Sequence, residues 1–128
     1  MKVEHIYDKG SGRFNEDTYL IIDDERFAVF DGASPLKPYQ DTQGRTGAMI
    51  AAALARDAFA VERSSLIEAA REANAQIRKA MHGANIDMSQ KKHLWATSAA
   101  AVKLHGPKAK PDFADWLQID DSLLSCLE

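Results

Sequence analysis

The chain has 128 residues, a formal net charge of −3, and 45% hydrophobic and 27% charged residues. This length allows one domain with a modest core and no second domain. The charge gives no reason to expect nucleic acid or an anionic membrane as a partner. No stretch approaches the roughly 20 apolar residues of a membrane span, and the start lacks the apolar run of a signal peptide. We therefore expect a cytoplasmic protein, and its one cysteine, Cys126, cannot form an internal disulfide.

The first third of the chain predicts three short strands. Residues 2–7 alternate well enough for a strand, and a glycine-containing turn follows. Residues 18–22 and 26–30 are β-branched and aromatic runs separated by the polar residues 23–25. This pattern is typical of an antiparallel hairpin.

Acidic residues stand at the two ends of this hairpin. Glu16 and Asp17 come just before its first strand, and Asp31 comes just after its second. Because the hairpin brings these ends together, we expect the three carboxylates to converge on one rim of the sheet. Like charges there repel unless a cation lies among them, and carboxylate oxygens suit Mg²⁺ or Mn²⁺. The alternative is a solvated turn, in which Glu16 or Asp17 caps a turn or pairs with Arg13 and no metal binds.

The dipeptide Asp31-Gly32 is a common hairpin turn. Here Pro35 and Pro38 follow, and proline cannot continue a strand ladder. We therefore predict that Asp-Gly ends a strand and leaves the Asp31 carbonyl and carboxylate available. Upstream, the guanidinium of Arg13 lies near the carboxylates in sequence, and its bidentate fork suits a phosphate.

Two helices and a second hairpin complete the predicted elements. Residues 43–60 are alanine-rich and predict a largely buried helix. Ser65 and Glu68 form a capping box for a second helix, with Gly83 as its stop. Its core stripe at helical spacing comprises Leu66, Ala70, Ala73, Ile77 and Met81. Residues 96–104 and 113–119 predict two strands joined by a long turn.

Several of these motifs together resemble one family. They are Arg13 with Asn15-Glu16-Asp17, the strand ending Val29-Phe30-Asp31-Gly32, the small-residue strand Ala96 to Val102, and Trp116 to Ser122. In this order and spacing they resemble the N-terminal half of the PP2C-type (PPM family) metal-dependent serine/threonine protein phosphatases.

The resemblance implies an α+β fold, the PP2C-like α-β-β-α sandwich, in an incomplete version with antiparallel strands and two antiparallel helices. Residues 1–128 would form a single phosphatase domain, apparently truncated. Asp31 would bridge two Mg²⁺ or Mn²⁺ ions, with Glu16 or Asp17 and the Gly32 carbonyl completing one side. A metal-activated water would attack phosphoserine or phosphothreonine of a protein substrate while Arg13 holds the phosphate oxygens.

The chain departs from the family at several points, of which three bear most on activity. Ala33 stands where some members have a histidine, Asp120 stands where the family has a glycine, and the chain has about half the length of a complete domain. An inactive phosphatase-like fragment that acts as a binding module is therefore the alternative function, and an unrelated small α/β domain is a third possibility. A half-domain would expose strand edges and an apolar face, which favours self-association or a completing partner chain.

Overall fold

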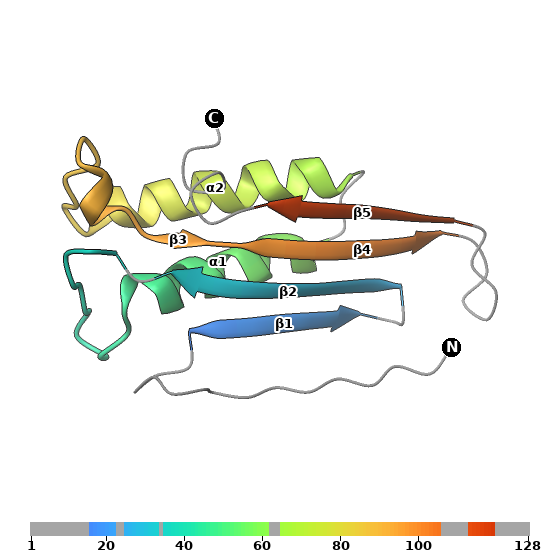
Figure 1. Ribbon diagram of the computed structural model, residues 1–128, viewed down its shortest axis with the longest axis horizontal. Helices are drawn as coiled ribbons and strands as arrows, with labels where there is room; N and C mark the ends of the chain where they lie inside the picture. The colour runs from blue at the N-terminus through green and yellow to red at the C-terminus, as the bar shows by residue number, and fades with distance from the viewer. Residues whose placement is uncertain (1–15, 23–24, 34, 62–64, 106–112, 120–128) are drawn as a thin grey trace.

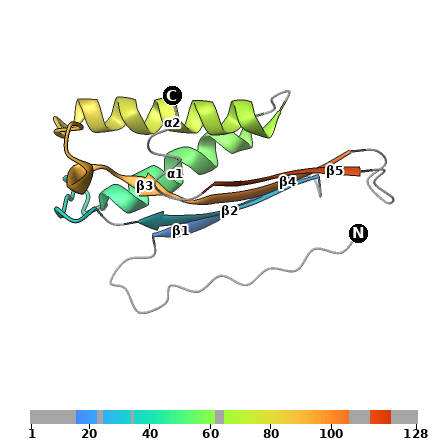
Figure 2. The ribbon, with the colours of Figure 1, turned by 45° about the horizontal axis from the view of Figure 1, so that its top comes forward.

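The computed structural model describes residues 16–22, 25–33, 35–61, 65–105 and 113–119 (Figure 1). It has an α+β fold in which an antiparallel sheet carries two helices on one face (Figure 2). The elements are β1 (Asp17–Ile22), β2 (Arg26–Ala33), α1 (Gly47–Ala60), α2 (Leu66–Gly83), a 3-10 turn (Lys91–His93), β3 (Ala96–Thr97), β4 (Ala99–His105) and β5 (Phe113–Ile119). The strand predicted over residues 2–7, and Arg13, Asp120 and Cys126, lie outside the described residues.

The sheet follows the order β1-β2-β4-β5, with β3 paired to β2. β1 and β2 form the first predicted hairpin, in which the Glu25 amide donates to the Ile22 carbonyl at 2.9 Å and closes the turn. β4 and β5 form the second, with Ala99 opposite Ile119. Both hairpin predictions are confirmed, but the strand predicted over residues 96–104 is divided at Ser98 into β3, which pairs with β2, and β4.

Strand β2 runs further than the sequence predicts. It continues through Asp31 and Gly32 to Ala33, because two neighbours extend its ladder. The Gly32 amide donates to the Glu16 carbonyl at 3.1 Å, and the Asp31 carbonyl accepts from the Ser98 amide at 2.9 Å. Asp31-Gly32 lies in the strand and not in a hairpin turn, as predicted, and β2 ends one residue later, at Ala33. The prediction that the Asp31 carbonyl is left available is wrong.

Helix α1 begins at Gly47, four residues after the predicted start at residue 43. The Asp41 carboxylate accepts from the amides of Gln43 and Arg45, each at 2.9 Å, and holds this segment in a turn. Thr46 is the N-cap, and its hydroxyl accepts from the Met49 amide at 3.2 Å. An N-cap side chain of this kind satisfies one of the helix's unpaired amides.

Helix α2 matches its prediction, since the Ser65 hydroxyl accepts from the Glu68 amide at 3.2 Å and the helix ends at Gly83. Of the predicted stripe, four residues are buried: Ala70, Ala73, Ile77 and Met81. None of the described helices is long and apolar enough to cross a membrane.

The core lies between the helices and the sheet. Alanines supply most of the buried face of α1, and such small side chains let the helix lie close to the strands. Phe30 of β2 meets Phe59 of α1 edge to face, with ring centroids 5.3 Å apart. Arg26 donates to three carbonyls at the end of α1, those of Phe59, Ala60 and Val61, each at 3.2 Å. A cation there complements the negative end of the helix dipole.

Candidate functional site

The acidic residues gather at the end of the sheet where β1 begins and β2 finishes. The register of the hairpin places Asp17 directly opposite Asp31. The hydrogen bond from the Gly32 amide to the Glu16 carbonyl extends this pairing by one residue. The structure thus brings together Glu16, Asp17, Asp31 and Gly32 from two segments of the chain.

The three carboxylates do not point the same way. Successive side chains of a strand point to opposite faces of the sheet, and Phe30 of β2 is buried under the helices while Val29 is exposed. Asp17 and Asp31 therefore share the face away from the helices. The Glu16 carboxylate lies on the helix side, where the Thr46 hydroxyl donates to it at 2.6 Å.

The closeness of Asp17 and Asp31 changes the acidity of the pair. The pKa of Asp17 rises from 3.8 to about 6, chiefly because its protonated form donates a hydrogen bond to Asp31. Partial burial and the charges of Asp31 and Glu16 act in the same direction. Two carboxylates this close resist ionising together, so a proton or a cation at this position stabilises the pair.

We call this end of the sheet the acidic corner and define it by Glu16, Asp17, Asp31 and Gly32. Packing at the acidic corner requires a glycine at position 32. A Cβ atom on Gly32 would lie 2.5 Å from the Ala48 carbonyl oxygen and 2.7 Å from that of Glu16. Because the amide and carbonyl of one residue in an antiparallel strand point to the same side, the Gly32 carbonyl lies toward Glu16. Sequence analysis identified Gly32 as a possible carbonyl ligand and missed its contact with α1, which involves residues distant in the sequence.

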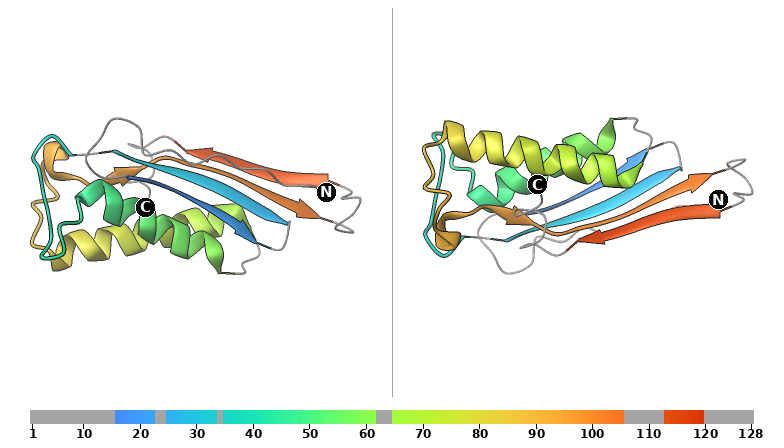
Figure 3. Two further views of the ribbon diagram at one scale, coloured as in Figure 1. Left: turned by 90° about the horizontal axis from the view of Figure 1, so that it is seen from below. Right: turned by 90° about the horizontal axis from the view of Figure 1, so that it is seen from above.

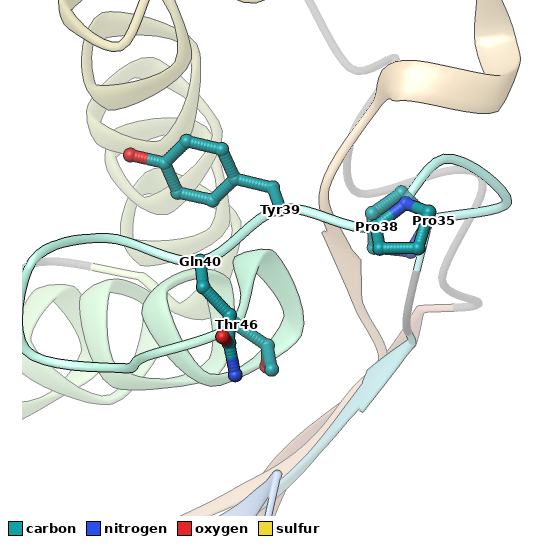
Figure 4. Close-up of a pocket in the computed structure, with 5 residues that line it drawn as sticks. All are labelled: Pro35, Pro38, Tyr39, Gln40 and Thr46. Atoms are coloured by element: carbon teal, nitrogen blue, oxygen red, sulfur yellow. The ribbon is translucent and has the colours of Figure 1, made fainter.

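A pocket adjoins this corner on the helix side. It has a volume of about 370 Å³ and is lined by Pro35, Pro38, Tyr39, Gln40 and Thr46. Figure 4 shows the two prolines on the loop that leaves β2, and Gln40 next to Thr46, with which it forms an isolated β-bridge. Thr46 also donates to Glu16, so the pocket and the acidic residues share one side chain. The sequence analysis did not predict this pocket.

The oxygen atoms at the acidic corner meet the requirements of a hard cation only in part. Asp17, Asp31 and the Gly32 carbonyl supply oxygen atoms of the kind that Mg²⁺ and Mn²⁺ prefer. Within the described segments, no group of three histidine, cysteine or acidic side chains is arranged to hold a metal ion. The orientation of Glu16 toward Thr46 agrees with this result. Arg13, the predicted phosphate ligand, lies outside the described residues.

Comparisons of the chain with protein-family models, with curated proteins and with solved structures found no match.

Proposed function

We propose that this chain has the PP2C-type phosphatase fold and function, hydrolysing phosphoserine or phosphothreonine of proteins with the help of Mg²⁺ or Mn²⁺. The observation that carries the proposal is the pairing of Asp17 with Asp31, which raises the pKa of Asp17 to about 6. A divalent cation held between the two carboxylates would relieve this repulsion. The antiparallel sheet with both helices on one face corresponds to one sheet and one helical layer of the proposed α-β-β-α sandwich.

Each residue of the proposed site would have its own role. Asp17 and Asp31 would hold the metal ions on the face away from the helices, and the Gly32 carbonyl would be a further ligand. The Glu16 carboxylate, which accepts a hydrogen bond from the Thr46 hydroxyl on the helix side, would position the start of β1. When bound, the ions lower the pKa of water and so supply a nucleophile at neutral pH. Arg13 would bind the phosphate oxygens of the substrate, and the site of action would be the cytoplasm.

The test is Mn²⁺-dependent hydrolysis of p-nitrophenyl phosphate by the purified chain. We expect turnover that requires the metal and that falls by at least about 100-fold in Asp31→Asn, since electrostatic stabilisation at such centres contributes that much. The matched control is Asp57→Asn, which removes an exposed carboxylate of α1 and should leave the rate unchanged. Folded protein with no metal-dependent turnover, or equal turnover in both variants, would reject the proposal.

A second candidate function is a binding module without catalysis. It is favoured by the face of the sheet opposite the helices, where Val29 and Trp116 are exposed. A folded chain that lacks phosphatase activity but associates through this face would support the second candidate over the first.

A further inference from the structure

The face of the sheet opposite the helices is apolar over most of its area. We call it the outer face and define it by Tyr19, Ile21, Phe27, Val29, Val102 and Trp116. Strand alternation places these side chains there, because their neighbours Leu20, Ala28 and Ala101 are buried under the helices. Both helices lie on the other side of the sheet (Figure 3).

The outer face is exposed as well as apolar. Trp116 is 73% exposed and Val29 is 59% exposed, although both are large hydrophobic side chains. Between them is a shallow hollow of about 210 Å³ whose lining includes Phe27 and Val102. Monomeric soluble proteins rarely expose large contiguous apolar patches, and such patches often mark an interaction site.

The pairing of the strands arranges this face in rows that cross the sheet. One row consists of Ile21, Phe27, Val102 and Trp116, which the register places opposite one another in turn. The adjacent row consists of Tyr19, Val29, Ala100 and Gln118. A third row, at the end of the strands, holds the Asp17 and Asp31 pair. The face is therefore apolar at its centre and acidic at one end.

We propose that a second copy of this chain covers the outer face, so that two sheets pack face to face around a two-fold axis. The two-fold axis would run across the strands, between the two apolar rows. It would place the row with Phe27 and Trp116 of one copy over the partner's row that contains the small Ala100. It also keeps the two acidic pairs apart by roughly 20 Å, because the acidic row of each copy lies about three residues from the axis and a strand rises about 3.3 Å per residue. An axis along the strands would instead bring the two acidic pairs to the same end of the interface.

The size of the face agrees with a weak dimer. Four strands spaced about 4.8 Å apart and roughly 23 Å long present roughly 440 Å² of flat sheet per copy. Two copies thus contribute roughly 880 Å² of flat sheet, and side chains raise the accessible area toward the lower limit of about 1,200 Å² for a specific interface. We therefore expect a dissociation constant on the order of micromolar. This inference does not depend on the proposed phosphatase activity.

The first experiment measures the mass of the full chain by sedimentation velocity from about 1 to 200 µM, a range that spans micromolar affinity. We expect a shift from monomer to dimer with concentration. Val29→Glu should weaken the dimer by at least about tenfold, because the two-fold axis places the new charge in the interface twice. The matched control is Ile67→Glu on α2, where the native side chain is 55% exposed, and it should dimerise as the wild type does.

The second experiment needs no destabilising variant. Trp95 is buried within the chain, so Trp116 is the tryptophan whose exposure dimerisation changes. We expect the emission of the wild type to move to shorter wavelength as its concentration rises, and Trp116→Phe to remove that shift. A chain that stays monomeric with Trp116 exposed would overturn the proposal. Protection of Trp116 at every concentration would also overturn it, because the chain itself would then cover the face.

Discussion

Both faces of the sheet carry large apolar side chains, but their surroundings differ. The covered face buries Leu20, Ala28 and Phe30 against the alanine-rich side of α1. The outer face carries Phe27, Val29 and other large apolar side chains, yet leaves them partly or largely exposed. Strands that are apolar on both sides are typical of sheets with a layer on each face. The exposure of the outer face supports the proposal that a second layer covers it.

The largest expected effect is a difference in how much side chains on the two faces contribute to the free energy of unfolding. Phe30→Ala removes a ring that is 1% exposed and packed on Phe59, and should lower the free energy of unfolding by about 3–5 kcal/mol. Val29→Ala, on the next residue of the same strand, should cost under about 1 kcal/mol in the monomer. Urea denaturation at low protein concentration measures both values. Equal costs would show that the outer face is already covered within one chain.

A smaller effect is expected at the corner where the sheet meets α1. Gly32→Ala places a Cβ against the backbone oxygens of Ala48 and Glu16, which cannot move as a side chain can. We expect a loss of about 2 kcal/mol of stability from this overpacking. Gly83→Ala at the end of α2 is the control, because a Cβ there meets no atom within 4 Å.

Gly83→Ala should be neutral or slightly stabilising, since alanine favours a helix more than glycine does. Thermal unfolding of the two variants beside the wild type makes the comparison. Equal stability of Gly32→Ala and Gly83→Ala would contradict the close approach of β2 to α1.

Local signals in the sequence predicted much of the fold. Both hairpins follow from runs of strand-forming residues around turns, and α2 follows from its Ser65 cap and apolar stripe. These features depend on residues close together in the chain. The start of α1 at Gly47 escaped prediction because the Asp41 side chain holds the preceding residues in a turn.

The acidic corner was predicted only in part, because its geometry depends on distant residues. The hairpin spacing predicted that Glu16, Asp17 and Asp31 would meet at one end of the sheet. The direction of Glu16 depends on Thr46, which lies 30 residues along the chain. The continuation of β2 through Asp31 depends on Ser98, 67 residues away. Neither partner leaves a signal near the acidic residues themselves.

The smallest expected effect concerns the pH dependence of stability at the Asp17 and Asp31 pair. The pKa of Asp17 is raised to about 6 in the folded chain from 3.8, so the folded state holds this proton more tightly than the unfolded state. The resulting stabilisation is fully present below pH 3.8 and is lost as pH rises to about 6. The Asp17 carboxyl is largely exposed, so screening by solvent limits the loss of folding free energy to about 1 kcal/mol. Asp31→Asn should remove the loss, and Asp57→Asn should retain it.

The most direct test of the acidic corner as a metal site repeats this stability curve with and without Mn²⁺. We predict that Mn²⁺ raises the melting temperature of the wild type above pH 6, where Asp17 is ionised, and has little effect near pH 4. The same rise should occur in Asp57→Asn and disappear in Asp31→Asn. A melting temperature that Mn²⁺ does not change at any pH, or changes equally in both variants, would contradict a metal site at Asp17 and Asp31.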